Sequence, residues 1–342
     1  MLSFLNDYSE GGHPRVMEDL MRTNQESTVG YGFDRYCEEA RSHITRKIKQ
    51  EGAETWFLAG GTLTNLTVIA HALKPHQAVI TACTGHINVH ETGAIEATGH
   101  KVLGLPSENG KLTSEMIEDC LAYHEDFFFV EPKMVYISNT TEVGTIYSKK
   151  ELMDLKACCE KNNLYLFMDG ARLAYALGAE ENDITWEDLG RYTDVLFIGG
   201  TKCGAMFGEA VTIIHEKLKK DFKYSIKQRG GLFAKGRLIG VQFISLLQEN
   251  LYEEIGKRAN EAAMILRDGL KELGFISPYD SPSNQQFVLM TEEEFQKISS
   301  VVLCGVEGKW KDGRCRVRFV TGWKNTEEEA KEAIEKIREI LS

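Results

Sequence analysis

The chain has 342 residues, of which 42 % are hydrophobic and 27 % are charged, so it is long enough for about two globular domains with buried cores. Its 40 Lys and Arg residues against 51 Asp and Glu residues give a net charge of −11, and such a charge argues against nucleic acid or an anionic membrane as a partner. No stretch approaches about 18 unbroken apolar residues, which argues against a transmembrane helix. The eight cysteines are scattered without a Cys-x-x-Cys pair, and the N-terminus lacks the pattern of an export signal, so we expect a reducing, cytoplasmic setting.

The first 35 residues have no strong hydrophobic period, and we expect residues 1–35 to form an arm that docks elsewhere on the molecule. Short runs that are apolar at every position then alternate with helix-length segments up to residue 235. Such runs are typical of strands that are covered on both faces of a mostly parallel sheet. The predicted strands are 56–58, 78–81, 134–138, 164–168 and 195–198, and the predicted helices include 62–73, 114–123 and 149–162. This alternation predicts a large wound α/β domain over residues 36–235.

After residue 235 the pattern changes to long helices followed by short strands. The predicted elements are helices over 235–250 and 251–273, strands over 286–290 and 316–320, and a charged closing helix over 326–340. They predict a smaller α+β domain over residues 236–342, packed on the first domain.

Three of the predicted strands end in unusual residues, at the sheet edge where open α/β proteins bind ligands. The first runs through Gly60 and Gly61 into Thr62 and a helix. Glycines let the backbone approach an anion, and a helix N-terminus offers free N–H groups to a phosphate. Taken alone, this segment is more typical of a tight turn in which Thr62 caps the helix.

The second strand end carries Asp169 and Arg172. Burying ionisable side chains at the end of a buried strand costs free energy, so such residues usually form an ion pair or belong to a functional site. The alternative is an aspartate that caps the next helix, with Arg172 in a surface salt bridge. The third end carries Lys202 among glycines, where burial lowers the pKa of an amine and makes it a candidate for a Schiff base. The alternative is a solvated lysine in a glycine loop. In this order, a phosphate cup, an Asp–Arg pair and such a lysine match what pyridoxal phosphate needs.

Six motifs in order resemble the low-specificity threonine aldolases of the β-eliminating lyase group, within the aspartate-aminotransferase-like (fold type I) enzymes that use pyridoxal phosphate. They are 60–65 (GGTLTN), 85–94 (GHINVHETGA), 141–145 (TEVGT), 169–172 (DGAR), 199–202 (GGTK) and 318–321 (RFVT). The resemblance spans nearly the whole chain. It implies the fold type I architecture, with a mostly parallel large domain and a smaller C-terminal α+β domain.

The resemblance also implies a role for the matched positions that bind the cofactor. Lys202 would hold the aldehyde of the cofactor as a Schiff base, and Asp169 would pair with the pyridine nitrogen. Gly61 and Thr62 would bind the phosphate, and His86 would stack on the ring and take part in catalysis.

Arg172, beside the cofactor, and Arg318 would bind the substrate carboxylate, for which a planar fork of N–H donors is the natural match. In relatives the N-terminal arm reaches the site, which brings Asp7 and Tyr8 to the substrate. Tyr31 matches a tyrosine that completes the site of a neighbouring subunit, so we expect a homodimer or a homotetramer.

A basic cluster lies in residues 227–237 and consists of Lys227, Arg229, Lys235 and Arg237. A solvated face is one interpretation. The resemblance implies that one of these cations reaches a cofactor phosphate across a dimer interface.

Many threonine aldolases carry a second active-site histidine where this chain has Thr141, which leaves His86, Glu142 or a bound water as the base. His86 and His90 have a spacing that can hold a metal, but Ile87 stands where a His-Glu-x-x-His site has its glutamate. We therefore expect no metal, and His90 to be a packed or surface residue.

The resemblance implies cleavage of L-threonine, L-allo-threonine or a related β-hydroxy-α-amino acid to glycine and an aldehyde. One alternative is another fold type I reaction, such as β-elimination or racemisation, because the fold does not determine the reaction. The other is a non-catalytic binding protein that has kept the scaffold.

Overall fold

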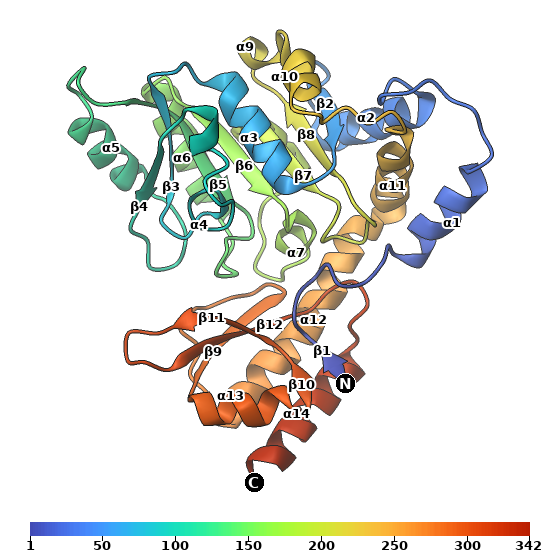
Figure 1. Cartoon of the computed structure of the whole chain (residues 1–342), viewed down its shortest axis with the longest axis vertical. Helices are drawn as coiled ribbons and strands as arrows, with labels where there is room; N and C mark the ends of the chain where they lie inside the picture. The colour runs from blue at the N-terminus through green and yellow to red at the C-terminus, as the bar shows by residue number, and fades with distance from the viewer.

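A computed structural model describes residues 1–342 and contains three β-sheets. Figure 1 shows a large domain around a seven-stranded sheet and a smaller domain around a three-stranded sheet, with helix α12 (Leu251–Glu272) running from one to the other. None of the helices combines the length and the apolar character needed to span a membrane.

The large sheet has the strand order β2-β8-β7-β6-β5-β3-β4. Its strands are β2 (Glu54–Leu58), β3 (Gln77–Ala82), β4 (Val102–Leu105), β5 (Glu131–Ser138), β6 (Tyr165–Gly170), β7 (Val195–Gly199) and β8 (Glu209–Ile213). Neighbours from β4 to β7 are parallel, whereas β8 is antiparallel to both β2 and β7. The prediction of a mostly parallel sheet is therefore confirmed.

All five strands predicted for the large domain are present, but the sequence analysis missed β4 and β8. β4 is a short edge strand that contains Gly104, and β8 begins at Glu209 and includes Thr212. Neither strand therefore has the unbroken apolar run by which the others were recognised.

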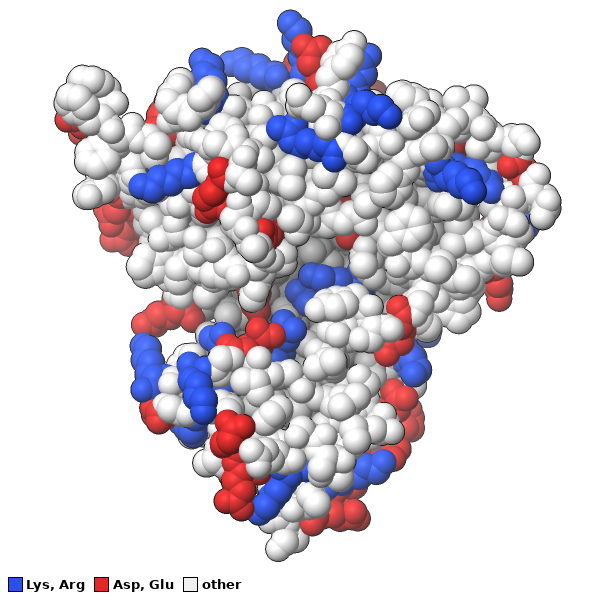
Figure 2. All heavy atoms as spheres, in the orientation of Figure 1, with Lys and Arg blue, Asp and Glu red and all other residues white.

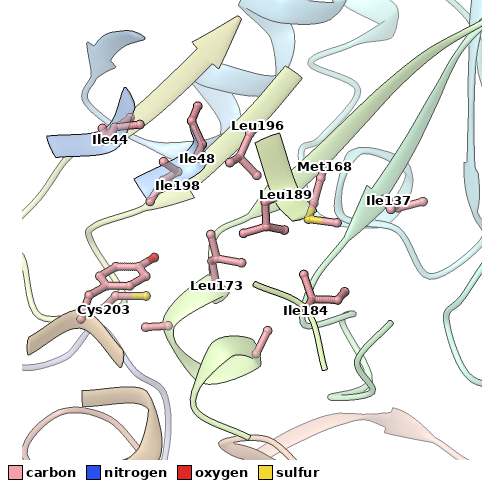
Figure 3. Close-up of a cluster of buried hydrophobic side chains, with 14 of the residues drawn as sticks. Ile44, Ile48, Ile137, Met168, Leu173, Ile184, Leu189, Leu196, Ile198 and Cys203 are labelled. Atoms are coloured by element: carbon pink, nitrogen blue, oxygen red, sulfur yellow. The ribbon is translucent and has the colours of Figure 1, made fainter. Parts of the chain in front are cut away.

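Helices cover both faces of this sheet, and consecutive residues of one strand enter different cores. In β6, Leu166 and Met168 belong to one core and Phe167 to the other. Figure 3 shows two contacts of the first core, with Leu196 of β7 beside Ile48 of α2 and Met168 of β6 beside Leu189 of α8. The helices of the large domain are α2 (Arg35–Ile48), α3 (Gly61–Ala72), α4 (His86–Val89), α5 (Ser114–Tyr123), α6 (Lys149–Lys161), α7 (Leu173–Leu177), α8 (Trp186–Tyr192), α9 (Glu216–Lys219), α10 (Phe222–Gln228) and α11 (Arg237–Leu247). Because both faces are apolar, the strands lack the period of two that a half-exposed strand has.

The small domain has an antiparallel sheet of order β11-β12-β9 against helices. Its elements after α12 are β9 (Gln285–Met290), α13 (Glu292–Ser299), β10 (Val302–Leu303), β11 (Gly305–Lys309), β12 (Cys315–Val320) and α14 (Glu327–Leu341). The predicted α+β character is confirmed. Two further elements were not predicted from the sequence: β11, which is largely exposed and contains two glycines, and the charged helix α13.

The N-terminal arm links the two domains. Its strand β1 (Leu2–Ser3) pairs with β10, and Phe4 is buried in the core of the small domain. Helix α1 (Pro14–Thr23) packs against α11 of the large domain. Asp7 lies between these two anchors, so the arm carries it across the boundary between the domains.

The expected domain division at residues 235 and 236 stays a prediction, and the packing favours a later position. α11 contributes Phe243 to a core of the large domain. In α12, Leu251 and Ala259 belong to that same core, whereas Ala262 and Leu270 belong to the core of the small domain. We therefore propose that the division lies within α12.

Candidate active site

Two adjoining cavities lie at the carboxyl edge of the large sheet. The inner cavity, of about 250 Å³, is lined by residues that include Gly61, Thr62, His86, Asp169, Arg172 and Lys202. The outer cavity, of about 690 Å³, shares Thr62, His86, Arg172 and Lys202 and adds Tyr8, Arg316 and Arg318. Figure 2 shows a hollow between the two domains with basic side chains inside it. The fold thus brings together most of the site residues that the sequence singled out.

The phosphate cup is formed where β2 runs into α3. Gly60 caps the helix without a side-chain hydrogen bond, so Thr62 is not the capping residue. The N–H groups of Gly61 and Thr62 have no hydrogen-bond partner within the chain. A Cβ atom added at Gly60 would meet no atom within 4 Å, so the space in front of this turn is open. Free N–H groups at the start of a helix fit a phosphate.

Lys202 lies in the glycine-rich loop after β7 and lines both cavities. Its backbone carbonyl accepts a hydrogen bond from the Tyr175 hydroxyl at 2.5 Å, which holds the loop. Burial lowers the pKa of the Lys202 amine, and the nearby Arg172 cation lowers it further. An amine in this state is a nucleophile, as a Schiff-base lysine must be. A solvated lysine in a glycine loop is therefore not what the structure shows.

Asp169 ends β6 and is held by hydrogen bonds at both carboxylate oxygens. Ala171 N–H donates to Oδ1 at 2.8 Å, and Asn65 Nδ2 donates to Oδ2 at 3.0 Å. The Tyr136 hydroxyl also donates to Oδ2. Burial, and then the Asp169 charge, raise the pKa of Tyr136 well above its ordinary value, so this hydroxyl keeps its proton. These three donors fix the orientation of the Asp169 carboxyl group at the inner cavity.

Sequence reasoning assigned no role to Asn65 or Tyr136. One signal was available for Asn65, because it follows Gly61 by one helical turn and so returns to the same face of α3. Tyr136 carried no such signal, because it sits within an apolar strand and resembles the rest of the core.

His86 begins α4 and is oriented by a buried carboxylate. Its Nδ1 lies 2.8 Å from Oε1 of Glu91, whose side chain is fully buried. Asn65 Nδ2 donates to the same oxygen at 2.8 Å, which connects His86 through Glu91 and Asn65 to Asp169. Because a carboxylate accepts, Nδ1 carries a hydrogen and Nε2 is left as the acceptor.

Glu142 is a second acid–base candidate in both cavities. Its Oε1 accepts from Ser138 Oγ at 2.6 Å and from His86 N–H at 2.8 Å. Burial raises the pKa of this carboxyl. Thr141 is buried, bonds Thr145 at 2.8 Å and lines neither cavity.

Arg172 forms its ion pair with Asp7 of the N-terminal arm and none with Asp169. Arg172 Nε and Nη2 donate to the Asp7 carboxylate at 2.7 and 3.1 Å, and Asn284 donates to it at 2.9 Å. Asp7 is buried, so this is not a surface salt bridge either. Burial alone would raise the pKa of Asp7, but Arg172 and Lys202 outweigh it and lower that pKa. The partner lay 165 residues away, which no local pattern could reveal.

Replacing Asp7 with asparagine should lower the free energy of unfolding by about 3 kcal/mol, because it leaves the buried Arg172 cation unpaired. Chemical denaturation at pH 7 measures this, with the exposed Asp119→Asn as the matched control. Since the pKa of Asp7 is lowered on folding, its stabilisation is present above the ordinary aspartate value and is lost as the pH falls through the lowered one. A variant as stable as wild type at pH 7 would show that the pair contributes nothing.

Arg318 and Arg316 both reach the outer cavity from β12, as their spacing in a strand predicts. Arg318 Nη2 lies 2.9 Å from Oε1 of Glu307, while its buried Nε has no partner. Arg316 donates to the Tyr279 hydroxyl at 3.0 Å and to the Glu307 carbonyl at 2.6 Å. Arg316 is thus held by two neutral oxygens of the small domain, whereas Arg318 forms an ion pair with the Glu307 side chain.

Tyr31 and the basic cluster of residues 227–237 do not line either cavity of their own chain. Tyr31 is exposed, and the Lys227 ammonium lies 4.5 Å from the centre of its ring. Arg237 donates to the Thr23 carbonyl at 2.9 Å, which ties it to the end of α1.

His90 is exposed, and its ring lies 5.6 Å from that of His86. No group of three or more His, Cys, Asp or Glu side chains is arranged to hold a metal ion. We assign no metal role to either histidine.

A mostly parallel sheet, a cup of free N–H groups and an unpaired lysine at its carboxyl edge define the class of fold type I enzymes. Thermus thermophilus aspartate aminotransferase has this fold, with a TM-score of 0.73 at 14 % identity over all of this chain and 92 % of that one. Residues 4–293 match the model of the β-eliminating lyases. The chain belongs to the β-eliminating lyase family.

Within this family the chain is similar to proteins named as threonine aldolases. It is 30 % identical to the low-specificity L-threonine aldolase of a Pseudomonas species, over 99 % of this chain and 98 % of that protein. It is 43 % identical to the Leishmania major threonine aldolase, with a TM-score of 0.98 over the full length of both chains. The β-eliminating lyases and aminotransferases of this fold depend on pyridoxal phosphate.

Proposed function

We propose that this protein cleaves L-threonine, L-allo-threonine or a related β-hydroxy-α-amino acid to glycine and an aldehyde, with pyridoxal 5′-phosphate as its cofactor. The observation that carries this proposal is the position of Lys202, an amine without an ion-pair partner in the same cavity as the phosphate cup and Asp169. The threonine aldolase relatives support the choice of reaction within the family.

The donor set of the inner cavity fits this cofactor. The N–H groups of Gly61 and Thr62 would bind the phosphate, and Lys202 would hold the aldehyde carbon. Asp169 would accept from the pyridine nitrogen, and the His86 ring would pack on the face of the cofactor. When bound, the cofactor supplies an electron sink for the charge that develops at the α-carbon of the amino acid.

Asp169 contributes electrostatically. Asn65 and Tyr136 donate hydrogen bonds that orient its carboxylate, and this carboxylate would hold a proton on the ring nitrogen of the bound cofactor. These donors are fixed before substrate arrives, so little reorganisation is needed during the reaction.

Arg318 is our principal candidate for binding the substrate carboxylate, because it lines the outer cavity and stands in the RFVT motif to which the resemblance gives this role. A buried Nε without a partner does not distinguish it, since Arg316 has one as well. Arg172 uses Nε and one N–H of Nη2 to bind Asp7, so only the two N–H groups of Nη1 and the second of Nη2 are left for the substrate. A fixed carboxylate orients the bond between the α- and β-carbons of the substrate.

His86 is our candidate for the base that takes the β-hydroxyl proton, at the Nε2 that the bond to Glu91 leaves free. The aldehyde then leaves, and the α-carbon receives a proton to form glycine. Glu142 is the second candidate for this role, since its raised pKa lets it exchange protons nearer neutral pH.

Product analysis tests the reaction directly. Incubation with L-threonine should release glycine and acetaldehyde in equal amounts. 2-Oxobutanoate with ammonia would instead show β-elimination, and D-allo-threonine would show racemisation at the α-carbon. Cofactor binding without turnover of any of these amino acids would favour the non-catalytic alternative.

We also propose a homodimer or a homotetramer, in which Tyr31 and one cation of the basic cluster complete a neighbouring site. The proposal is supported by their position outside the cavities of their own chain. Sedimentation velocity at assay concentration should show a dimer or a larger species, and dilution to monomers should lower the specific activity. A fully active monomer would remove Tyr31 and the cluster from the site. A cytoplasmic setting stays a proposal that rests on the scattered cysteines.

A further inference from the structure

The inner cavity contains a buried carboxyl group, that of Glu209, which the mechanism above does not use. Glu209 is the first residue of β8, the strand that runs antiparallel to its two neighbours. It is in register with Leu58 at the end of β2 and with Gly199 at the end of β7. Glu209 therefore lies between the end of β2, which leads to the phosphate cup, and the end of β7, which leads to Lys202.

The carboxyl group of Glu209 is held by hydrogen bonds from the loop after β7 and forms no ion pair. Oε2 accepts from Gly200 N–H at 2.8 Å, and the Thr201 hydroxyl is a second donor to the carboxyl group. Burial raises the pKa of Glu209 to about 7, although the bonds from Thr201 and Gly200 and the Lys202 charge oppose the shift. A substantial fraction of Glu209 is therefore protonated and neutral at physiological pH.

The titratable groups that face Glu209 come from three elements. They are Lys202 and Cys203 from the loop after β7, Asp169 from β6 and Tyr252 from α12. The end of β2 and the first turn of α3, residues 58–62, contribute no charged side chain. Across the cavity lie His86, Glu142 and Arg172. Lys202 is the one cation close to Glu209, and its pKa is itself lowered by burial.

A phosphate monoester is a dianion above about pH 7, and an ionised Glu209 beside it would be repelled. A protonated carboxyl group has the opposite effect, because its hydroxyl donates a hydrogen bond. Buried carboxylic acids that stay neutral act as donors in this way.

We propose that Glu209 is a neutral carboxylic acid in the loaded protein and donates a hydrogen bond from Oε1 to a phosphate oxygen of the cofactor. The inference rests on the cofactor assignment in the proposed function. Where the free Glu209 carboxyl is ionised, binding of the cofactor phosphate must therefore be accompanied by the uptake of one proton from solvent by Glu209.

The test compares binding of pyridoxamine 5′-phosphate by wild type and by Glu209→Gln between pH 6.5 and 9. This probe has no aldehyde and cannot react with Lys202, so binding alone is measured, by absorbance or calorimetry. Glutamine is a neutral donor of the same shape, and we expect similar dissociation constants at pH 6.5. Above about pH 7 the wild type must take up a proton to bind, whereas the variant need not. The dissociation constant of the wild type, divided by that of the variant, should therefore grow about tenfold for each further pH unit.

Two controls isolate the effect. Pyridoxamine lacks the phosphate but shares every other titrating group of the probe, so its ratio should not change with pH. Glu54→Gln changes an exposed carboxyl at the far end of the neighbouring strand β2, outside both cavities, and should keep the wild-type pH dependence.

Calorimetry on the wild type alone covers the case in which Glu209→Gln does not fold. At pH 8, in two buffers of different ionisation enthalpy, pyridoxamine 5′-phosphate should take up close to one proton more per site than pyridoxamine. A flat ratio, or equal proton uptake for the two ligands, would overturn the role of Glu209 alone. If the phosphate form binds no better than pyridoxamine to the wild type, the cofactor assignment fails and this inference fails with it.

Discussion

Replacing Lys202 with alanine should reduce the cleavage of L-threonine by at least about a thousandfold, because the amine that we propose binds the cofactor covalently is lost. The wild-type protein should show a visible absorption band that the variant lacks. Borohydride reduction of the wild type, followed by peptide mass analysis, should find the cofactor attached to Lys202. Lys202 is suited to this attachment because its pKa is lowered by burial and by Arg172.

The exposed Lys223→Ala serves as the matched control, since Lys223 lines neither the inner nor the outer cavity. It should keep both the absorption band and the activity. Cofactor trapped on any other lysine would show that the site is wrongly assigned.

Replacing Arg318 with alanine should lower kcat/KM by about a hundredfold, as expected for a charge-assisted contact in a partly buried site. The loss should appear in kcat as well as in KM, because the same contact orients the bond that breaks. Burial, and then the neighbouring Arg172, lower the pKa of Arg318, although the Glu307 carboxylate at 2.9 Å opposes this shift. Release of acetaldehyde from L-threonine measures the effect.

Arg316→Ala is the internal control, because Arg316 shares the strand and the cavity but is bonded to Tyr279 and to the Glu307 carbonyl. It should stay within a few-fold of wild type. If Arg316→Ala loses activity and Arg318→Ala does not, Arg316 and not Arg318 binds the substrate carboxylate. If neither matters, the small domain does not bind the substrate carboxylate.

Local sequence was sufficient for the architecture and for the positions that lie at strand ends. Strands covered on both faces must be apolar throughout, so five strands of the large domain could be predicted from their runs alone. β8 could not, since Glu209 and Thr212 interrupt its run. Lys202, Asp169 and Gly61 could be found because the carboxyl ends of parallel strands must meet at one edge.

Contacts between distant segments decided the rest of the site. Arg172 pairs with Asp7 of the N-terminal arm, and no property of the 169–172 motif indicates that partner. Glu91 and Tyr136 hold His86 and Asp169 through side-chain geometry that exists only when α3, α4, β5 and β6 are packed together. The character of Glu209 is likewise set by the desolvation of its carboxyl between β2 and β7. Backbone periodicity is a local property that a sequence carries in full, whereas a pKa or an ion pair depends on which groups the fold brings within a few ångströms.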